Sequence, residues 1–130
     1  MKTSLQLALS VLILGACSSA SDSKILGGPD MAALGSEKDE TGAVVEKFDL
    51  NGDRKADLWK KFKIIKTEDG KGRKILFRKE MDLNFDGKVD VRVHLDEDGT
   101  MFKEEMDLDF DGHIDAVAHY KDGFLVKREL

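Results

Sequence analysis

The chain has 130 residues and a formal net charge of −5, so it is long enough for one small domain. Its hydrophobic share of 41 % is too high for a fully disordered chain. The acidic balance argues against nucleic acid as a partner, because phosphate binding requires a basic surface. Twelve glycines against one proline favour β-structure punctuated by glycine turns.

The first residues have the pattern of a secretory leader. Lys2 precedes an apolar run that ends in Leu14-Gly15-Ala16-Cys17. The run is too short for a membrane-spanning helix, which needs about 20 apolar residues. Residues 1–16 are therefore predicted to be a signal peptide. Residues 14–17 resemble the bacterial lipobox, which implies cleavage before a lipid-modified Cys17. The alternative is an ordinary secreted protein with a stray thiol.

Cysteine usage agrees with a lipid anchor. Cys17 is the only cysteine, which excludes a disulfide framework and a thiolate zinc site. Diacylglycerol and N-acyl chains on this residue would supply the two or more tails that stable anchoring requires. By resemblance to enterobacterial sorting, Ser18 favours the outer membrane. The expected location is the cell envelope, with the membrane reached through the lipid.

Residues 17–42 are small, polar and charged, with a turn cluster at Gly27-Gly28-Pro29-Asp30. We expect this segment to be a flexible tether, with at most one helical turn at residues 31–34. Residues 43–130 are predicted to form the folded domain.

The domain is an internal repeat. One nine-residue pattern, Asp-x-Asx-x-Asp-x-x-x-Asp, occurs at residues 49–57 (loop 1), 82–90 (loop 2) and 107–115 (loop 3). The offsets of 33 and 25 residues indicate a short supersecondary unit with one longer link. Positions 1, 3, 5 and 9 supply the candidate metal ligands, which are Asp49, Asn51, Asp53, Asp57, Asp82, Asn84, Asp86, Asp90, Asp107, Asp109, Asp111 and Asp115.

Alternating sequence flanks each loop, as in Val89, Val91, Val93 and Leu95. Period two predicts strands with one apolar face, while Asp90, Arg92, His94 and Asp96 define an opposite face that we expect to be solvated. Asp-Gly turns mark the other strand ends. The predicted fold is all-β, a small antiparallel up-and-down meander of about seven strands. Its apolar face must be covered by curling, by a second copy or by a partner.

The aspartate spacing fits calcium. Calcium takes six to eight oxygen ligands, and alternate side chains of a tight turn converge on one point. A helical EF-hand needs Glu at position 12, where this chain has Lys60, Val93 and Ala118. The loops instead resemble the β-hairpin calcium loops of integrin-like FG-GAP repeats, which close the shell with Asp at position 9. The resemblance covers each loop and its flanking strands, and does not extend to a propeller.

Up to three Ca²⁺ ions are expected, in unequal sites. Loop 3 has four carboxylates and should bind most tightly, while loop 2 has three. Loop 1 places Gly52 at position 4 and Arg54 at position 6, so its geometry is the least secure. The alternative for each loop is an Asx-Gly turn that binds nothing. Loss of Lys2 with the leader leaves a net charge of −6, which three calcium ions would balance.

The expected function is that of an outer-membrane-anchored lipoprotein with a calcium-stabilised module, acting as a binding or structural component of the envelope. A small domain with short strands often needs metal as a staple. An envelope protein or a polysaccharide is the expected partner. The chain is also similar to envelope lipoproteins of surface-gliding and predatory bacteria, which implies an alternative role in motility or cell-contact machinery.

We predict that the chain is not an enzyme. No serine follows Ser36, and the three histidines lack an obvious catalytic partner. His94 and His119 occupy equivalent repeat positions, where a transition-metal site is the alternative to exposed surface histidines. A small envelope hydrolase is the alternative from a different functional class. Trp59 is either an exposed aromatic contact or a packing residue at a sheet edge.

Overall fold

The structure, a computed structural model, describes residues 31–130. The predicted signal peptide and Cys17 lie outside the described residues. The strands are β1 (Ala32–Lys38), β2 (Val44–Asp49), β3 (Leu58–Lys66), β4 (Gly72–Met81), β5 (Val91–Leu95), β6 (Met101–Met106), β7 (Ala116–Lys121) and β8 (Phe124–Glu129). Within the described part of the chain, no helix is long and apolar enough to cross a membrane.

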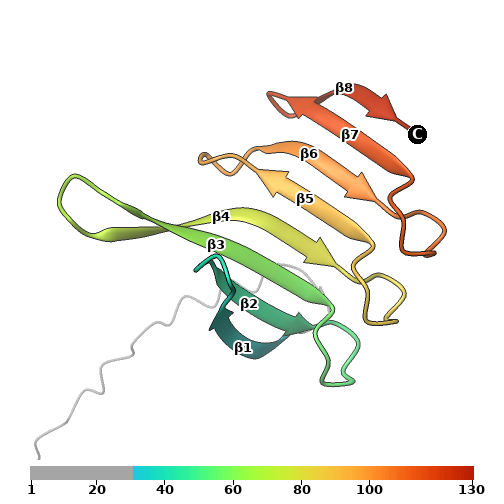
Figure 1. Cartoon of the computed structure of the whole chain (residues 1–130), viewed down its shortest axis with the longest axis horizontal. Coiled ribbons are helices and arrows are strands. Elements are labelled where there is room, and N and C mark those ends of the chain that lie inside the picture. Colours follow the sequence, from blue (N-terminus) through green and yellow to red (C-terminus); the bar gives the residue numbers. More distant parts are fainter. Residues whose placement is uncertain (1–30) are drawn as a thin grey trace, which may run out of the picture.

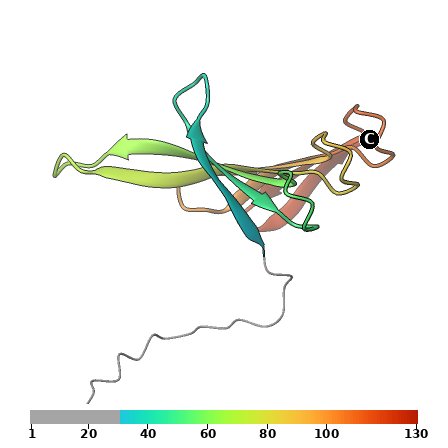
Figure 2. The same ribbon diagram turned by 90° about the horizontal axis from the view of Figure 1, so that it is seen from below.

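The eight strands form one antiparallel sheet in chain order, which confirms the predicted all-β up-and-down meander (Figure 1). Seen from below, the sheet is one twisted layer (Figure 2). Within residues 31–130, no second layer of strands or helices packs on either face. The core is correspondingly small, and its buried apolar residues are Ala43, Val45, Leu58, Ile75, Val91, Ala116 and Ala118.

The expectation of seven strands was one short. The additional strand, β1, lies in the segment predicted to be a tether, and the helical turn expected at residues 31–34 is wrong. All seven β1 residues are exposed. The strand pairs with β2 from Ala32, opposite Asp49, to Lys38, opposite Val44. Backbone pairing along an open sheet edge therefore holds β1, because its side chains bury almost nothing.

The repeat is visible in the strand pairing. A shift of register occurs at equivalent places in the β3–β4, β5–β6 and β7–β8 hairpins, where Phe77, Phe102 and Val126 are left without a partner. Such bulges increase the local twist of a sheet. The β3–β4 hairpin has strands of 9 and 10 residues against 5 and 6 in β5–β6, which accounts for the longer sequence offset.

One sheet face carries the predicted apolar alternation. Directly paired residues form a row across six strands, made of Phe48, Leu58, Met81, Val91, Met106 and Ala116. Three of them are buried, although this face has no covering layer among the described residues. Cross-strand packing of this kind is the main side-chain contribution to sheet stability.

The opposite face is only partly solvated: the expectation holds for the exposed Asp96 and is wrong for the other three residues. Asp90 is only 1 % exposed, and Arg92 and His94 are half-buried. Each hairpin on this face holds one glutamate between two basic side chains, in the groups Lys61–Glu80–Arg78, His94–Glu105–Lys103 and His119–Glu129–Lys127. This face therefore carries ordered polar side-chain groups rather than a set of free surface charges.

Candidate metal centre

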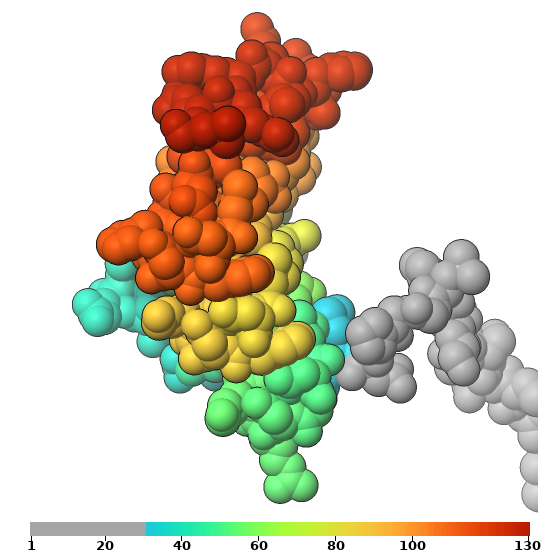
Figure 3. Space-filling model, turned by 90° about the vertical axis from the view of Figure 1, so that its right-hand side faces the viewer, coloured from blue at the N-terminus to red at the C-terminus, as the bar shows by residue number. Residues whose placement is uncertain are grey.

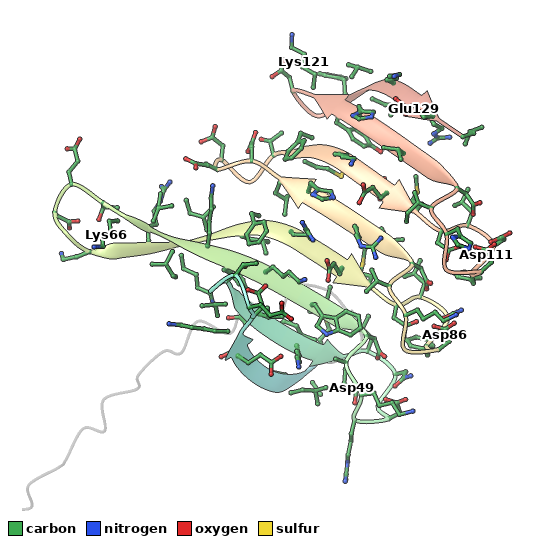
Figure 4. The ribbon with its side chains drawn as sticks, in the orientation of Figure 1. Asp49, Lys66, Asp86, Asp111, Lys121 and Glu129 are labelled. Carbon is green, nitrogen blue, oxygen red and sulfur yellow. The ribbon has the colours of Figure 1, made fainter. Side chains whose placement is uncertain are left out.

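The three aspartate loops lie at one end of the sheet. They join β2 to β3, β4 to β5 and β6 to β7, while the glycine turns occupy the opposite end (Figure 1). Asp49, Asp86 and Asp111 mark the loop end in Figure 4, and Lys66 and Lys121 mark the turn end. A view onto the loop end shows the three loops stacked side by side (Figure 3).

Backbone hydrogen bonds connect each loop to the neighbouring loop. The amide of Asp82 donates to the carbonyl of Asp57 at 2.8 Å, and the amide of Asp107 donates to that of Asp90 at 2.8 Å. Position 1 of one loop is therefore fixed against position 9 of the loop before it. The spacing between loops follows from the sheet and does not depend on flexible side chains.

The same side-chain network organises all three loops. The position 1 carboxylate accepts a hydrogen bond of 2.7 Å from the amide at position 6, and the position 9 carboxylate accepts one of 2.6–2.8 Å from the amide at position 2. Side chains at positions 3 and 5 accept from the amides two residues further on. The aspartates thus fold the loop as well as concentrating negative charge.

Two positions in every loop have a left-handed backbone. At position 4, Gly52 has φ 85°, and Phe85 and Phe110 both have φ 62°. At position 6, Arg54 has φ 69°, while Gly87 and Gly112 have φ 91° and 96°. A non-glycine residue in this conformation costs about 1–2 kcal/mol. Each loop therefore places glycine at one left-handed position and accepts strain at the other.

Loop 1 has the same left-handed positions as the other two loops, although its glycine is at position 4 instead of position 6. The exchange of glycine between positions 4 and 6 leaves the backbone path unchanged, because Arg54 adopts the conformation that glycine supplies in the other loops. Sequence reasoning missed this equivalence. The signal was present in the repeat alignment, in which every loop has one glycine at either position 4 or position 6.

Carboxylates converge in two of the three loops. Within residues 31–130, Asp49, Asp53 and Asp57 each place an oxygen within 4.8 Å of the others, and Asp107, Asp109 and Asp115 do the same. Loop 2 contributes no such group of three. Asp111 is also outside the loop 3 group, and its Oδ1 accepts from the amide of His113 at 2.8 Å. These two clusters could hold a metal ion.

The position 1 carboxylates of the two clusters have different surroundings. The Asp49 side chain accepts bonds from the amides of Asn51, Gly52 and Arg54, at 3.1, 2.6 and 2.7 Å. Burial would raise the pKa of Asp49, but these amides stabilise the charged form, and the pKa lies below its ordinary value of 3.8. The backbone amides of loop 1 therefore supply hydrogen bonds to the buried carboxylate of Asp49.

Asp107 is not satisfied in this way. It is 3 % exposed, and its Oδ2 accepts from the amide of Gly112 at 2.7 Å. Its Oδ1 is buried without a hydrogen-bond partner among the described residues. An unpaired buried carboxylate oxygen is costly, and it is the arrangement expected of an atom that ligates a cation. The donor set of carboxylate oxygens fits a hard cation such as Ca²⁺.

The paired histidine site considered from the sequence is not formed. His94 and His119 lie on β5 and β7, and Lys103 of β6 pairs directly with both of them. Their rings lie against carboxylates, with His94 Nε2 3.1 Å from Glu105 and His119 Nε2 3.7 Å from Glu129. Both are half-buried rather than exposed.

Comparison with known proteins does not place the chain in a family. No family model, curated protein or solved structure matches it.

Proposed function

We propose that this protein is an envelope lipoprotein, anchored through Cys17 to the outer membrane, whose aspartate loops bind calcium and brace a thin β-sheet that serves as a binding and structural module. The unpartnered, buried Oδ1 of Asp107 carries the calcium part of this proposal. Convergence of Asp107, Asp109 and Asp115 supports it, since three carboxylates at this separation repel one another without a cation.

A structural use of calcium also fits the small core. The sheet has one layer within residues 31–130, and much of its apolar surface stays exposed. Domains with so little buried core commonly depend on metals or other staples. Calcium bound at the loop end would hold together neighbouring loops that the backbone already links through Asp82 and Asp107.

The test is a thermal melt of the full chain in detergent, with millimolar calcium and with a chelator. At about 100 times the dissociation constant, bound calcium adds roughly 2.7 kcal/mol, which corresponds to a rise in midpoint of about 10–20 °C for a domain of this size. We expect calcium to raise the midpoint of D107N less than that of the unsubstituted protein, and to raise the midpoint of the control variant D96N by the full amount. Asp96 is the control because it is an aspartate at the turn end that accepts bonds from the amides of Asp98 and Thr100. No shift in the unsubstituted protein would contradict calcium binding.

A further inference from the structure

Two of the three aspartate loops also expose large apolar side chains. Positions 2 and 4 of loops 2 and 3 carry Leu83, Phe85, Leu108 and Phe110, which we call the apolar tip. Their exposed fractions are 49, 46, 58 and 42 %. Leu and Phe therefore alternate with the metal-ligand positions in the sequence, at the end of the sheet where the loops stack side by side (Figure 3).

The phenylalanines are not required by the loop backbone. Gly52 makes the same left-handed turn at position 4 of loop 1, and a Cβ built there would meet no atom within 4 Å. Position 4 of that loop thus faces open space. Phe85 and Phe110 adopt a left-handed backbone conformation that residues other than glycine rarely adopt, and both rings stay substantially exposed. Backbone strain of this kind is concentrated at functional positions, and exposed apolar side chains gathered at one end of a domain commonly mark a contact surface.

The strand register shows that the chain enters the sheet at its loop end. Ala32, the first residue of β1, pairs with Asp49, the first residue of loop 1, so the chain enters the sheet at the loop end. Cys17 precedes Ala32 by 15 residues, and such a segment spans at most about 50 Å. A bilayer that holds Cys17 is therefore within reach of the apolar tip, at the high effective concentration that tethering provides.

Charge determines when the tip can approach that bilayer. Loops 2 and 3 hold seven aspartates in two short segments, and these repel anionic lipid headgroups. Each bound Ca²⁺ would remove two negative charges beside the apolar side chains. Lys88, at position 7 of loop 2, would then face the headgroups with less competition from aspartate.

We propose that the apolar tip inserts into the interfacial region of the phospholipid bilayer to which the chain is anchored, and that calcium bound in loop 3 promotes this insertion. The inference rests on the proposed function, since it uses both the Cys17 anchor and the calcium sites. Insertion of four apolar side chains holds the loop end against the membrane and directs the turn end away from it.

The experiment uses the full lipidated chain in vesicles of phosphatidylcholine and phosphatidylglycerol, in a W59F background. The reporter is F110W, and quenching of its fluorescence by bromine-labelled phospholipid is measured with calcium and with a chelator. The matched control is F124W, because Phe124 is 76 % exposed and begins β8 at the turn end. We expect at least twofold more quenching of the reporter in calcium, and none of the control in either condition.

The outcomes distinguish the proposal of bilayer insertion from the proposal of calcium binding. Quenching of F110W no greater than that of F124W would overturn bilayer insertion, and the surface would then belong to a protein partner or a second copy. Equal quenching of F110W with and without calcium would overturn the claim that calcium promotes insertion. Thermal melts of the same samples report calcium binding independently. A calcium shift without quenching leaves the metal proposal intact, and the loss of both contradicts the metal proposal as well.

Discussion

Loop 1 and loop 3 reach the same backbone path from different sequences, yet their carboxylates are satisfied differently. Asp49 accepts bonds from three amides, whereas Asp107 accepts one and keeps a buried oxygen without a partner. Convergence of three carboxylates is common to both loops. The difference teaches that convergence alone does not define a metal site, because a loop can also satisfy its aspartates with its own amides.

The largest expected effect follows directly from this comparison. D107N should remove half or more of the calcium-induced rise in midpoint, which is a loss of about 5–10 °C. D49N should retain most of the rise, because loop 3 is intact in that variant. Thermal melts with titrated calcium measure both values. An equal loss in the two variants would show that the loops share the calcium response.

A second prediction concerns the protein in chelator. D49N should lower the midpoint by about 4–8 °C, since the neutral amide is a weaker acceptor for three backbone amides. D107N should leave the midpoint unchanged or raise it, because the substitution removes a buried negative charge that a single backbone amide stabilises. A destabilised D107N in chelator would contradict the difference between the two loops.

A smaller effect is expected from the left-handed positions. R54G should stabilise the protein by about 0.5–1 kcal/mol, because relief of strain at φ 69° exceeds the entropy cost of glycine. The converse variant G112R places a side chain at φ 96° and should destabilise by about 1–2 kcal/mol. Urea unfolding at neutral pH measures both changes. A stabilising G112R would refute the strain argument.

The smallest effect concerns pH. The pKa of Asp49 is lower in the folded protein than its ordinary value of 3.8, so its contribution to stability is fully present above that value. It is lost as the pH falls through the lower folded pKa. Melts in chelator should therefore be level from neutral pH to about pH 5 and decline below about pH 4. D49N should decline less steeply, and an identical profile would exclude Asp49 as a contributor.

Much of the fold could be predicted because each repeat contains local sequence signals for its own strands and turns. Period-two apolar residues, Asp-Gly turns and aspartate loops all favour the same meander, and the strands lie where these signals place them. Strand β1 escaped prediction because it has no apolar alternation and all its side chains are exposed. Pairing along a sheet edge depends on the backbone of a neighbouring strand, which a local pattern does not reveal.

The candidate site was predictable as a set of positions but not as a geometry. Spacing placed all the candidate ligands in the three loops, yet only six of the ten aspartates among them belong to the two carboxylate clusters. Hydrogen bonds to backbone amides orient the carboxylates, but they do not alone select the cluster members, since Asp53 and Asp111 accept equivalent bonds and only Asp53 belongs to a cluster. Those bonds depend on local torsions, including the left-handed conformation of Arg54, that residue type alone does not specify.

The repeated hydrogen bond between neighbouring loops makes the sheet a linear array of interchangeable units. Asp82 and Asp107 each attach to the carbonyl of the position 9 aspartate one loop earlier, at the same 2.8 Å. Deletion of residues 82–106 would join Met81 to Asp107 in the same phase and leave a shorter ribbon with both ends preserved. In such arrays, stability approximates a sum of nearest-neighbour contributions, so this architecture can change length by whole hairpins without redesign of its ends.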